Sequence, residues 1–430
     1  MKLRRQSGRG IFTLALVAVV LLGGAIRARG QAYRVIHDFR GWPDDGCEIV
    51  GVPAVANNGD LYGVTNSCGT YEYYGTVFKL AAPRTRGGAW TKTILHDFPG
   101  GQGGGYPTSL VLGKDGNLYG VDYSQTIFEL TAPNAGDGVW TYTAVYTLDQ
   151  SQGASIQGNL VFDAEGNLYG ATGIGGDLGC EQEGCGTVFE LKRPTIDGGK
   201  WRLSVLHTFT GSPDGGEPFA GVVFDQKGNL YGTTNAGGSA GDGAVYRVSP
   251  PTRKGRPWAE IVLYSFDRSN NGAYSPGSPL IFDTLGNMYG TTAGGGDPNC
   301  QAGYGCGVVF ELSPEEGAVW SYAMLHAFQG GDDGIYPTGY MVFDLEGNLY
   351  GTTQTGGGET KGGTVYRLKP SAQNGGEWTE TVLHAFTGSN GDGAVPESGL
   401  TWGKWSDLYG VTGEGGTECQ ACGTAFELQP

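Results

Sequence analysis

The sequence predicts an all-β fold, a seven-bladed β-propeller with four strands per blade. First, the pentapeptide Gly-Asn-Leu-Tyr-Gly, or a close variant, occurs seven times at intervals of 50 to 62 residues. Second, each interval holds four short strand-like segments bounded by Gly, Pro, Asn or Asp, without helical periodicity. Third, the two ends of the chain supply complementary parts of one repeat. A solenoid has a shorter period and need not close, so a propeller fits better. The repeated tyrosines are Tyr62, Tyr119, Tyr169, Tyr231, Tyr289, Tyr350 and Tyr409.

Residues 1–30 are predicted to be a secretory signal peptide, and residues 31–430 the propeller. Lys2 and Arg4 belong to a basic start, residues 11–22 form an apolar run, and Ala28 and Gly30 suit a signal peptidase. The alternative is an uncleaved anchor. No second apolar run of spanning length follows, so no transmembrane segment is expected after cleavage. A secreted, extracellular or cell-surface monomer is therefore predicted.

The composition of the chain limits the classes of partner that it is expected to bind. The net charge of −16 becomes about −22 once the six positive charges of residues 1–30 are removed. A chain this acidic is not expected to bind nucleic acid or an anionic membrane. Solubility explains the charge, and bound divalent cations are the alternative. With 81 glycines, 39% hydrophobic and 11% aromatic residues, the chain is too apolar for disorder and suits short strands joined by turns.

One unit, residues 157–209, illustrates the predicted blade. Its strands are expected over residues 157–163, 168–172, 186–191 and 201–209, with a Gly-rich loop between the second and third. The first turn begins at Asp163, whose carboxylate can accept backbone N–H groups, and Gly166 can take a positive φ. The equivalent aspartates of other units are Asp225, Asp283 and Asp344. These acids are interpreted as turn residues.

The chain ends indicate how the ring closes. Residues 423–428 read as a third strand without a fourth, and residues 33–39 match the fourth-strand pattern of residues 381–386. The N-terminal strand is therefore predicted to complete the last blade, which leaves no open sheet edge.

The order and spacing of GNLYG, GTVFEL and a terminal HxF over residues 33–430 resemble the GloVer-type tandem-repeat proteins of bacterial secretomes. This resemblance implies export and, often, a C-terminal sorting anchor, but no established activity. Because the sequence stops at Pro430 directly after a strand, no such anchor is expected here. The Asp-x-x-Gly-Asn-Leu-Tyr turn is also similar to one in NHL and gluconolactonase-like propellers. That similarity is confined to a hairpin and implies no metal ligands.

Histidine and tryptophan each recur at a fixed position of the repeat. All five histidines lie near the end of fourth strands, spread around the ring, so they are interpreted as structural, with metal ligation the alternative. The tryptophans open fourth strands and are interpreted as packing between blades, with sugar binding the alternative. These residues are His37, His96, His207, His326 and His384, and Trp90, Trp140, Trp201, Trp258, Trp320 and Trp378.

Eight cysteines are predicted to form disulfides in an exported protein. Cys47 and Cys68 fall in connections that emerge on one face of a propeller, so they are expected to pair. The other six form three close pairs in loops between second and third strands: Cys180 and Cys185, Cys300 and Cys306, and Cys419 and Cys422. The last pair has redox spacing but no βαβ context, and a zinc site would need four thiolates from one place.

Acidic, Gly-rich connections precede several first strands. Oxygen ligands on turns are what calcium prefers, although none of these segments has EF-hand spacing. Turn formation by Asp-Gly is the alternative explanation. The candidate calcium ligands are Asp45, Asp214, Asp333 and Asp392.

The second unit breaks the repeat, because its Gly-Gly loop is missing. A shortened blade is expected to leave a notch in the rim of long loops, lined by Asp122, Tyr123 and Gln125. Degeneration of one repeat is the alternative.

These observations favour a binding or scaffold module for an extracellular glycan or protein ligand, held on the face with the long loops. Catalysis is not favoured. The alternative is an extracellular hydrolase or lyase with a metal in the central channel. That alternative requires acids unique to single units to converge at the channel mouth, and the candidates are Glu217 and Glu397.

Overall fold

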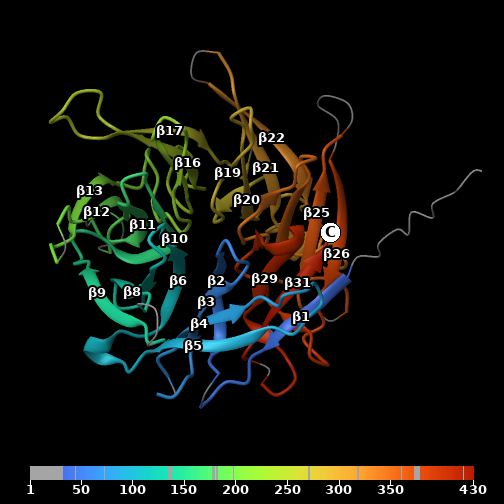
Figure 1. Cartoon of the computed structure of the whole chain (residues 1–430). Coiled ribbons are helices and arrows are strands. Elements are labelled where there is room, and N and C mark those ends of the chain that lie inside the picture. Colours follow the sequence, from blue (N-terminus) through green and yellow to red (C-terminus); the bar gives the residue numbers. More distant parts are fainter. Residues whose placement is uncertain are drawn as a thin grey trace, which may run out of the picture.

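The computed structural model describes residues 32–430, apart from residues 44, 72, 134–137, 177–179, 181–182, 197, 270–271, 317–318, 360, 372–377 and 420. Seven four-stranded antiparallel blades surround one axis, with first strands such as β2 and β6 toward the centre (Figure 1). The fold is therefore the predicted seven-bladed β-propeller. The predicted signal peptide lies outside the described residues. Within those residues, no helix is long and apolar enough to cross a bilayer.

The first three blades each contain four consecutive strands. Blade one contains β2 (Cys47–Val55), β3 (Leu61–Ser67), β4 (Thr76–Ala81) and β5 (Thr91–Asp97). Blade two contains β6 (Pro107–Leu112), β7 (Leu118–Asp122), β8 (Thr126–Thr131) and β9 (Thr141–Thr147). Blade three contains β10 (Ala154–Phe162), β11 (Leu168–Ile174), β12 (Thr187–Lys192) and β13 (Arg202–Thr208).

The later blades have shorter first strands, and that of blade five is split into β18 and β19. Blade four contains β14 (Val223–Phe224), β15 (Leu230–Thr234), β16 (Ala244–Ser249) and β17 (Ala259–Ser265). Blade five contains β18 (Tyr274–Pro276), β19 (Ile281–Phe282), β20 (Met288–Gly294), β21 (Val308–Pro314) and β22 (Trp320–Ala327). Blade six contains β23 (Val342–Phe343), β24 (Leu349–Thr353), β25 (Thr364–Lys369) and β26 (Thr379–Ala385).

Blade seven joins the two ends of the chain. It contains β28 (Leu400–Trp402), β29 (Leu408–Thr412), β31 (Thr424–Gln429) and β1 (Ala32–Asp38). A small ribbon of β27 (Gly393–Ala394) and β30 (Glu414–Gly415) and three 3₁₀ turns complete the elements: η1 (Gly101–Gly103), η2 (Cys300–Gly303) and η3 (Lys404–Ser406).

The ring closes as the sequence predicted. The N-terminal β1 pairs antiparallel with β31, with Tyr33 opposite Leu428, and the blue strand lies along the red one in Figure 1. Blades six and seven are also joined near the axis, where the Leu400 N–H donates to the Tyr340 carbonyl at 3.0 Å. Backbone pairing thus satisfies groups that would otherwise form an open edge.

The repeated pentapeptide makes the turn between first and second strands. In blade three, Asp163 accepts the backbone N–H of Asn167 at 2.8 Å and the hydroxyl of Tyr169 at 3.2 Å. Gly166 has a φ of +85°, which glycine adopts without strain. A Cβ at Gly170 would lie 2.7 Å from the ring of Phe189, so the final glycine lets the third strand pack closely. Equivalent contacts at Asp225, Asp283 and Asp344 confirm the turn interpretation.

The seven tyrosines and the tryptophans hold neighbouring blades together. Trp90 of blade one packs on Tyr409 of blade seven, with ring centroids 5.5 Å apart, and Trp201 of blade three packs on Tyr119 at 6.0 Å. Both pairs meet at steep angles, which aromatic rings favour. This arrangement confirms that the periodic tryptophans pack between blades.

Candidate functional site

The two faces of the propeller carry different connections. The turn face, as we call it, holds the first-to-second turns and the third-to-fourth loops, and the loop face holds the second-to-third and blade-to-blade connections. The turn face is nearly the same in every blade. The loop face varies, from residues 123–125 in blade two to residues 295–307 in blade five. Variable connections on a rigid scaffold are where binding residues are usually found.

Four disulfides lie on the loop face. The pairs are Cys47–Cys68, Cys180–Cys185, Cys300–Cys306 and Cys419–Cys422. All four predicted pairings are confirmed, including the one that joins two separate connections. Three of the bonds lie within single loops of blades three, five and seven, which restricts the conformations of the connections that could contact a ligand.

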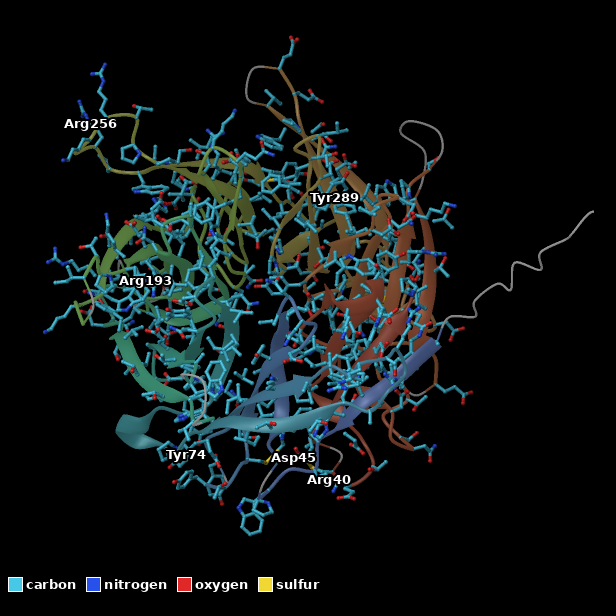
Figure 2. The ribbon with its side chains drawn as sticks, in the orientation of Figure 1. Arg40, Asp45, Tyr74, Arg193, Arg256 and Tyr289 are labelled. Carbon is cyan, nitrogen blue, oxygen red and sulfur yellow. A yellow bond between two sulfur atoms is a disulfide. The ribbon has the colours of Figure 1, made fainter. Side chains whose placement is uncertain are left out.

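Four of the five histidines are paired with an aspartate in the next connection. His207 Nε2 lies 3.1 Å from an oxygen of Asp214, whose other oxygen accepts the Thr210 N–H at 3.0 Å. Asp45 likewise contacts His37 and the backbone N–H of Arg40 at the outer edge of the ring (Figure 2). The remaining two pairs, in blades five and six, are His326–Asp333 and His384–Asp392. Each pair fixes the exit of a fourth strand.

These partners give the four predicted calcium ligands a different role. Burial would raise the pKa of Asp45, but hydrogen bonds from His37 and Lys92 lower it to about 2. Burial is likewise outweighed at Asp392, where hydrogen bonds from His384 and Tyr33 lower the pKa. Carboxylates that already accept several hydrogen bonds have fewer lone pairs for a cation. In the described part of the chain, no group of three His, Cys, Asp or Glu could hold a metal. Calcium binding at these residues stays a prediction.

In each blade, one residue with a left-handed backbone precedes the residues that line the central channel. Glu217 illustrates the arrangement: its N–H donates to the Cys185 carbonyl of the preceding blade, and its carbonyl accepts the Asn235 N–H, both at 2.9 Å. These two bonds hold a φ of +56°, which is unfavourable for a residue with a Cβ. The equivalent residues are Glu48, Tyr106, Ser155, Ser275, Tyr336 and Val395. Because the feature recurs in all seven blades, we interpret it as scaffold.

The channel itself is narrow and is crossed by Tyr340. A hollow of about 180 Å³ is lined by residues of all seven blades, including Glu397 and Tyr340. The Asn159 N–H of blade three donates to the Tyr340 hydroxyl of blade six at 2.8 Å. Burial raises the pKa of this phenol to about 12. A tyrosine that spans the axis leaves little room for a substrate.

The two candidate catalytic acids lie in different blades with different partners. Glu217 of blade four accepts the Asn235 side-chain amide at 3.3 Å and is not among the residues that line the channel hollow. Glu397 of blade seven contacts the side-chain amide of Gln354. The structure therefore does not bring them together around one described pocket.

Blade two does not form the predicted notch lining. Asp122 is 1% exposed and accepts the N–H groups of Ser124 and Thr126, so it holds the short turn together from inside. Burial raises the pKa of this carboxyl. Gln125 accepts the Ile156 N–H of blade three at 3.1 Å. Tyr123 alone projects outward, 73% exposed. A shortened connection thus closes over its own polar groups.

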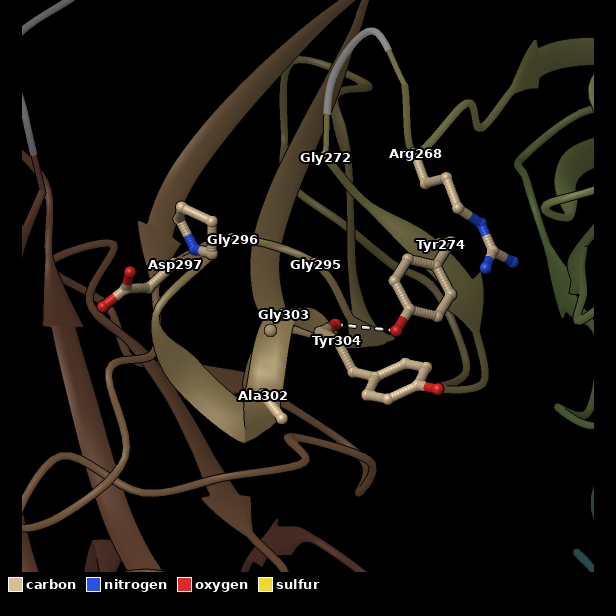
Figure 3. A pocket seen from close by; sticks show the side chains of 11 residues that line it. Arg268, Gly272, Tyr274, Gly295, Gly296, Asp297, Ala302, Gly303 and Tyr304 are labelled. Atoms are coloured by element: carbon tan, nitrogen blue, oxygen red, sulfur yellow. Dashed lines mark hydrogen bonds between the residues drawn. The ribbon is translucent and has the colours of Figure 1, made fainter.

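A hollow of about 340 Å³ lies instead on the loop face at blade five (Figure 3). Tyr274, at the start of β18, and Tyr304, from the long loop, form its aromatic wall. The Tyr274 hydroxyl donates to the Tyr304 carbonyl at 2.7 Å, which joins the two connections. Tyr304 is 66% exposed. Asp297 lies at the opposite side of the hollow, where its carboxylate accepts the Asn299 N–H at 2.8 Å.

Arg268 completes the wall and is held in place from two sides. Its guanidinium carbon lies 4.3 Å from the centre of the Tyr274 ring, a cation–π contact. Its Nε donates to Asp242 of blade four at 2.6 Å. The guanidinium has five N–H donors in a planar fork, and Asp242 does not use all of them. The arrangement can therefore present an aromatic surface and fixed donors to a polar ligand.

The sequence analysis missed this hollow. Its residues come from two segments, the entry into blade five and the long loop between β20 and β21, and nothing in the order of residues says that these two segments meet. A weak signal was present, because blade five has an aromatic residue between its two loop cysteines, Cys300 and Cys306, where blade three has Glu183 between Cys180 and Cys185.

Comparisons with known proteins agree with the fold. The model of the Gloeobacter/Verrucomicrobia repeat family matches residues 25–195 and 178–426. No curated protein matches the sequence.

Solved structures with the same architecture are distant in sequence. A streptogramin B lyase is 11% identical, with a TM-score of 0.55 over 93% of this chain and 97% of that chain. The extracellular domain of a B. thetaiotaomicron protein described as a one-component system is 10% identical, with a TM-score of 0.55 over 92% of this chain. This chain spans 40% of the length of that protein. At such identities the likeness shows the fold alone.

Proposed function

Since the chain belongs to the Gloeobacter/Verrucomicrobia repeat family, which implies no activity of its own, we propose a function from the site: the protein is a binding module that holds a glycan in the blade-five hollow. One observation carries the proposal. Arg268 and Tyr274 from the entry into blade five meet Tyr304 of the long loop around one open hollow of about 340 Å³. Ligand sites typically combine an apolar wall with a few well-placed polar groups.

The chemistry of the wall fits a sugar. The C–H face of a pyranose packs against an aromatic ring, and exposed Tyr304 offers such a ring. Hydroxyl groups need fixed donors and acceptors, which the Arg268 guanidinium and the Asp297 carboxylate would supply. Glycine-rich backbone around the hollow lets a ligand approach main-chain N–H and C=O groups closely.

An extracellular location supports this role. Four disulfides are typical of proteins that fold in an oxidising compartment. One structural neighbour is itself an extracellular domain. A secreted or surface-bound protein with a rigid ring and restricted loops is suited to recognition of cell-wall or environmental glycans.

The enzyme alternative has less support. A streptogramin B lyase shares the fold, but catalysis in the channel would require groups that converge on a substrate. Here Tyr340 crosses the axis, Glu217 contacts an amide of its own blade, and Glu397 contacts an amide of blade six. A protein ligand is the second class of partner for the same face.

A glycan array tests the proposal. The full chain and its Tyr304→Ala variant are compared in calcium and in chelator. We expect hits for the wild-type protein in both solutions and their loss in the variant. Because Tyr304 is exposed, a circular dichroism spectrum should confirm that the variant is folded. No hit in either solution, with the fold intact, would overturn the glycan proposal.

A further inference from the structure

A second hollow lies on the turn face, between blades six and seven. It measures about 650 Å³, and its lining combines apolar and aromatic residues with polar ones: Phe343, Leu345, Tyr350, Trp402 and Pro430, and Asp344, Glu346, Asn348, Arg367 and Ser406. It is separate from the blade-five site, because its residues belong to the opposite end of the strands. We call the contact between two neighbouring blades a seam. The other six seams of the propeller show which side chain occupies the equivalent position.

Six of the seven repeated tyrosines have two aromatic or aliphatic neighbours from the next blade. One is the tryptophan at the start of the fourth strand, and in five seams its ring centroid lies 5.5 to 6.4 Å from the tyrosine ring at an inclination of 56° to 67°. In a sixth seam, Trp320 packs into the cluster around Tyr231. The other neighbour is a first-strand residue, such as Phe162 on Tyr119, at 5.0 to 5.2 Å and 81° to 82°.

The seam at Tyr350 has only the second neighbour. Trp402 comes from the first strand of blade seven and meets Tyr350 at 5.5 Å and 80°, which is the geometry of the phenylalanine contact. The fourth strand of blade seven is β1, and the position before it is Gln31, not tryptophan. Among the described residues, no fourth-strand tryptophan packs on Tyr350. The hollow therefore lies where an indole sits in the other six seams.

One position of the rim is apolar where the equivalent position of three other turns is polar or small. Leu345 follows Asp344 in the turn and is fully exposed. The residues at the same position in other turns are Ala164, Gln226 and Thr284. Contact between water and an exposed leucine beside an open aromatic surface is unfavourable. Burial of this leucine against a partner would remove that contact.

We propose that this hollow is a docking site for a tryptophan side chain exposed on a partner protein. The six filled seams define the ligand, because each places an indole beside the tyrosine at the same position of the repeat. A tryptophan brought by a partner would contact Trp402 and Phe343, while Leu345 would cover it from the turn. Buried aromatic anchors of this kind commonly dominate protein–protein contacts.

Fluorine NMR of N-acetyl-5-fluorotryptophan amide, titrated with the full chain, tests this site. We expect the resonance to broaden with the wild-type protein and the affinity to fall at least fivefold in Leu345→Asp. Leu285→Asp is the matched control, because Leu285 is an exposed turn residue of blade five, where Trp378 fills the seam; its affinity should equal the wild type. Both changes are at exposed positions, so both variants should fold.

Three results would overturn the proposal. The first is no broadening with the wild-type protein, or equal broadening with all three proteins. The second is binding by a chain that begins at Ala32 but not by the full chain, which would assign the hollow to the chain's own first residues. The third is a concentration-dependent dimer in sedimentation velocity that Leu345→Asp abolishes, which would make a second copy the occupant.

Discussion

Blades five and two are the two extremes of the loop face. A tyrosine lies at the entry to each blade, Tyr106 and Tyr274, and an aspartate lies at the end of the second strand or in the connection that follows it. In blade five the connection is long, and Asp297 lies at the side of an open hollow. In blade two it is three residues long, and Asp122 is buried beneath it.

The difference shows how a binding site arises on a repeated scaffold. In the shortened connection of blade two, Asp122 points inward, because its carboxylate accepts backbone N–H groups of the short turn that would otherwise be unsatisfied. Adding a loop created a hollow, because Tyr304 could reach the neighbouring connection and be joined to Tyr274. Three predictions test this contrast.

The largest expected effect is on stability, from the buried aspartate. Asp122→Ala leaves the N–H groups of Ser124 and Thr126 without their acceptor, so we expect a loss of about 3 kcal/mol in the free energy of unfolding. Asp297→Ala, at the partly exposed turn of blade five, should cost less than about 1 kcal/mol. Urea unfolding measures both. Equal losses of unfolding free energy in the two variants would contradict the described difference between a buried and a partly exposed aspartate.

The next effect concerns the disulfide of the blade-five loop. The paired change Cys300→Ser and Cys306→Ser should lower stability by about 2 kcal/mol, the loop-closure value for a short ring. Glycan affinity should fall as well, because the loop that carries Tyr304 gains freedom. Cys180→Ser with Cys185→Ser is the matched control in blade three. It should lower stability similarly and leave affinity unchanged; a loss of affinity in both would argue against a site at blade five.

A smaller effect concerns the seam that follows blade five, where Glu380 lies near Asp333 and His326. Burial and then the charge of Asp333 raise the pKa of Glu380 to about 7. The folded state therefore binds a proton that the unfolded state releases near pH 4.5, and stability falls as the pH rises from about 4.5 to 7. Because the carboxyl is only half buried, screening limits the effect to about 1 kcal/mol.

Glu380→Gln should flatten that part of the pH profile of thermal unfolding. Glu165→Gln, at an exposed turn, should leave the profile unchanged. The seam that enters blade two contains His96 and Tyr142 stacked at 4.8 Å and has no such glutamate. If the stability of Glu380→Gln fell with pH as steeply as that of the wild-type protein, Glu380 would not be the group that releases this proton.

The sequence was sufficient for the scaffold, because every scaffold feature is repeated. The turn at Asp163, the aromatic packing of Trp201 and the closure by β1 each follow from local patterns that recur. The pairing of Cys47 with Cys68 also followed, since the topology places both connections on one face.

The candidate site could not be predicted in the same way. Arg268 and Tyr274 lie at the entry into blade five and Tyr304 lies in its long loop, and the contact between these two segments depends on loop conformations that the repeat pattern does not encode. The inward orientation of Asp122 was missed for a related reason. A shortened repeat shows which residues are missing, but it does not show how the remaining polar groups form hydrogen bonds. The left-handed backbone of Glu217 and its equivalents has one signal in the sequence. In five of the seven blades, a proline follows the left-handed residue directly.

The most direct test of the account compares two exposed tyrosines. Isothermal titration of the best glycan from the array measures the dissociation constant for the wild-type protein, Tyr304→Ala and Tyr123→Ala. Loss of a stacking contact of about 1.4 kcal/mol predicts at least about tenfold weaker binding for Tyr304→Ala and no change for Tyr123→Ala. Weaker binding in Tyr123→Ala with full affinity in Tyr304→Ala would place the ligand at blade two and contradict the account.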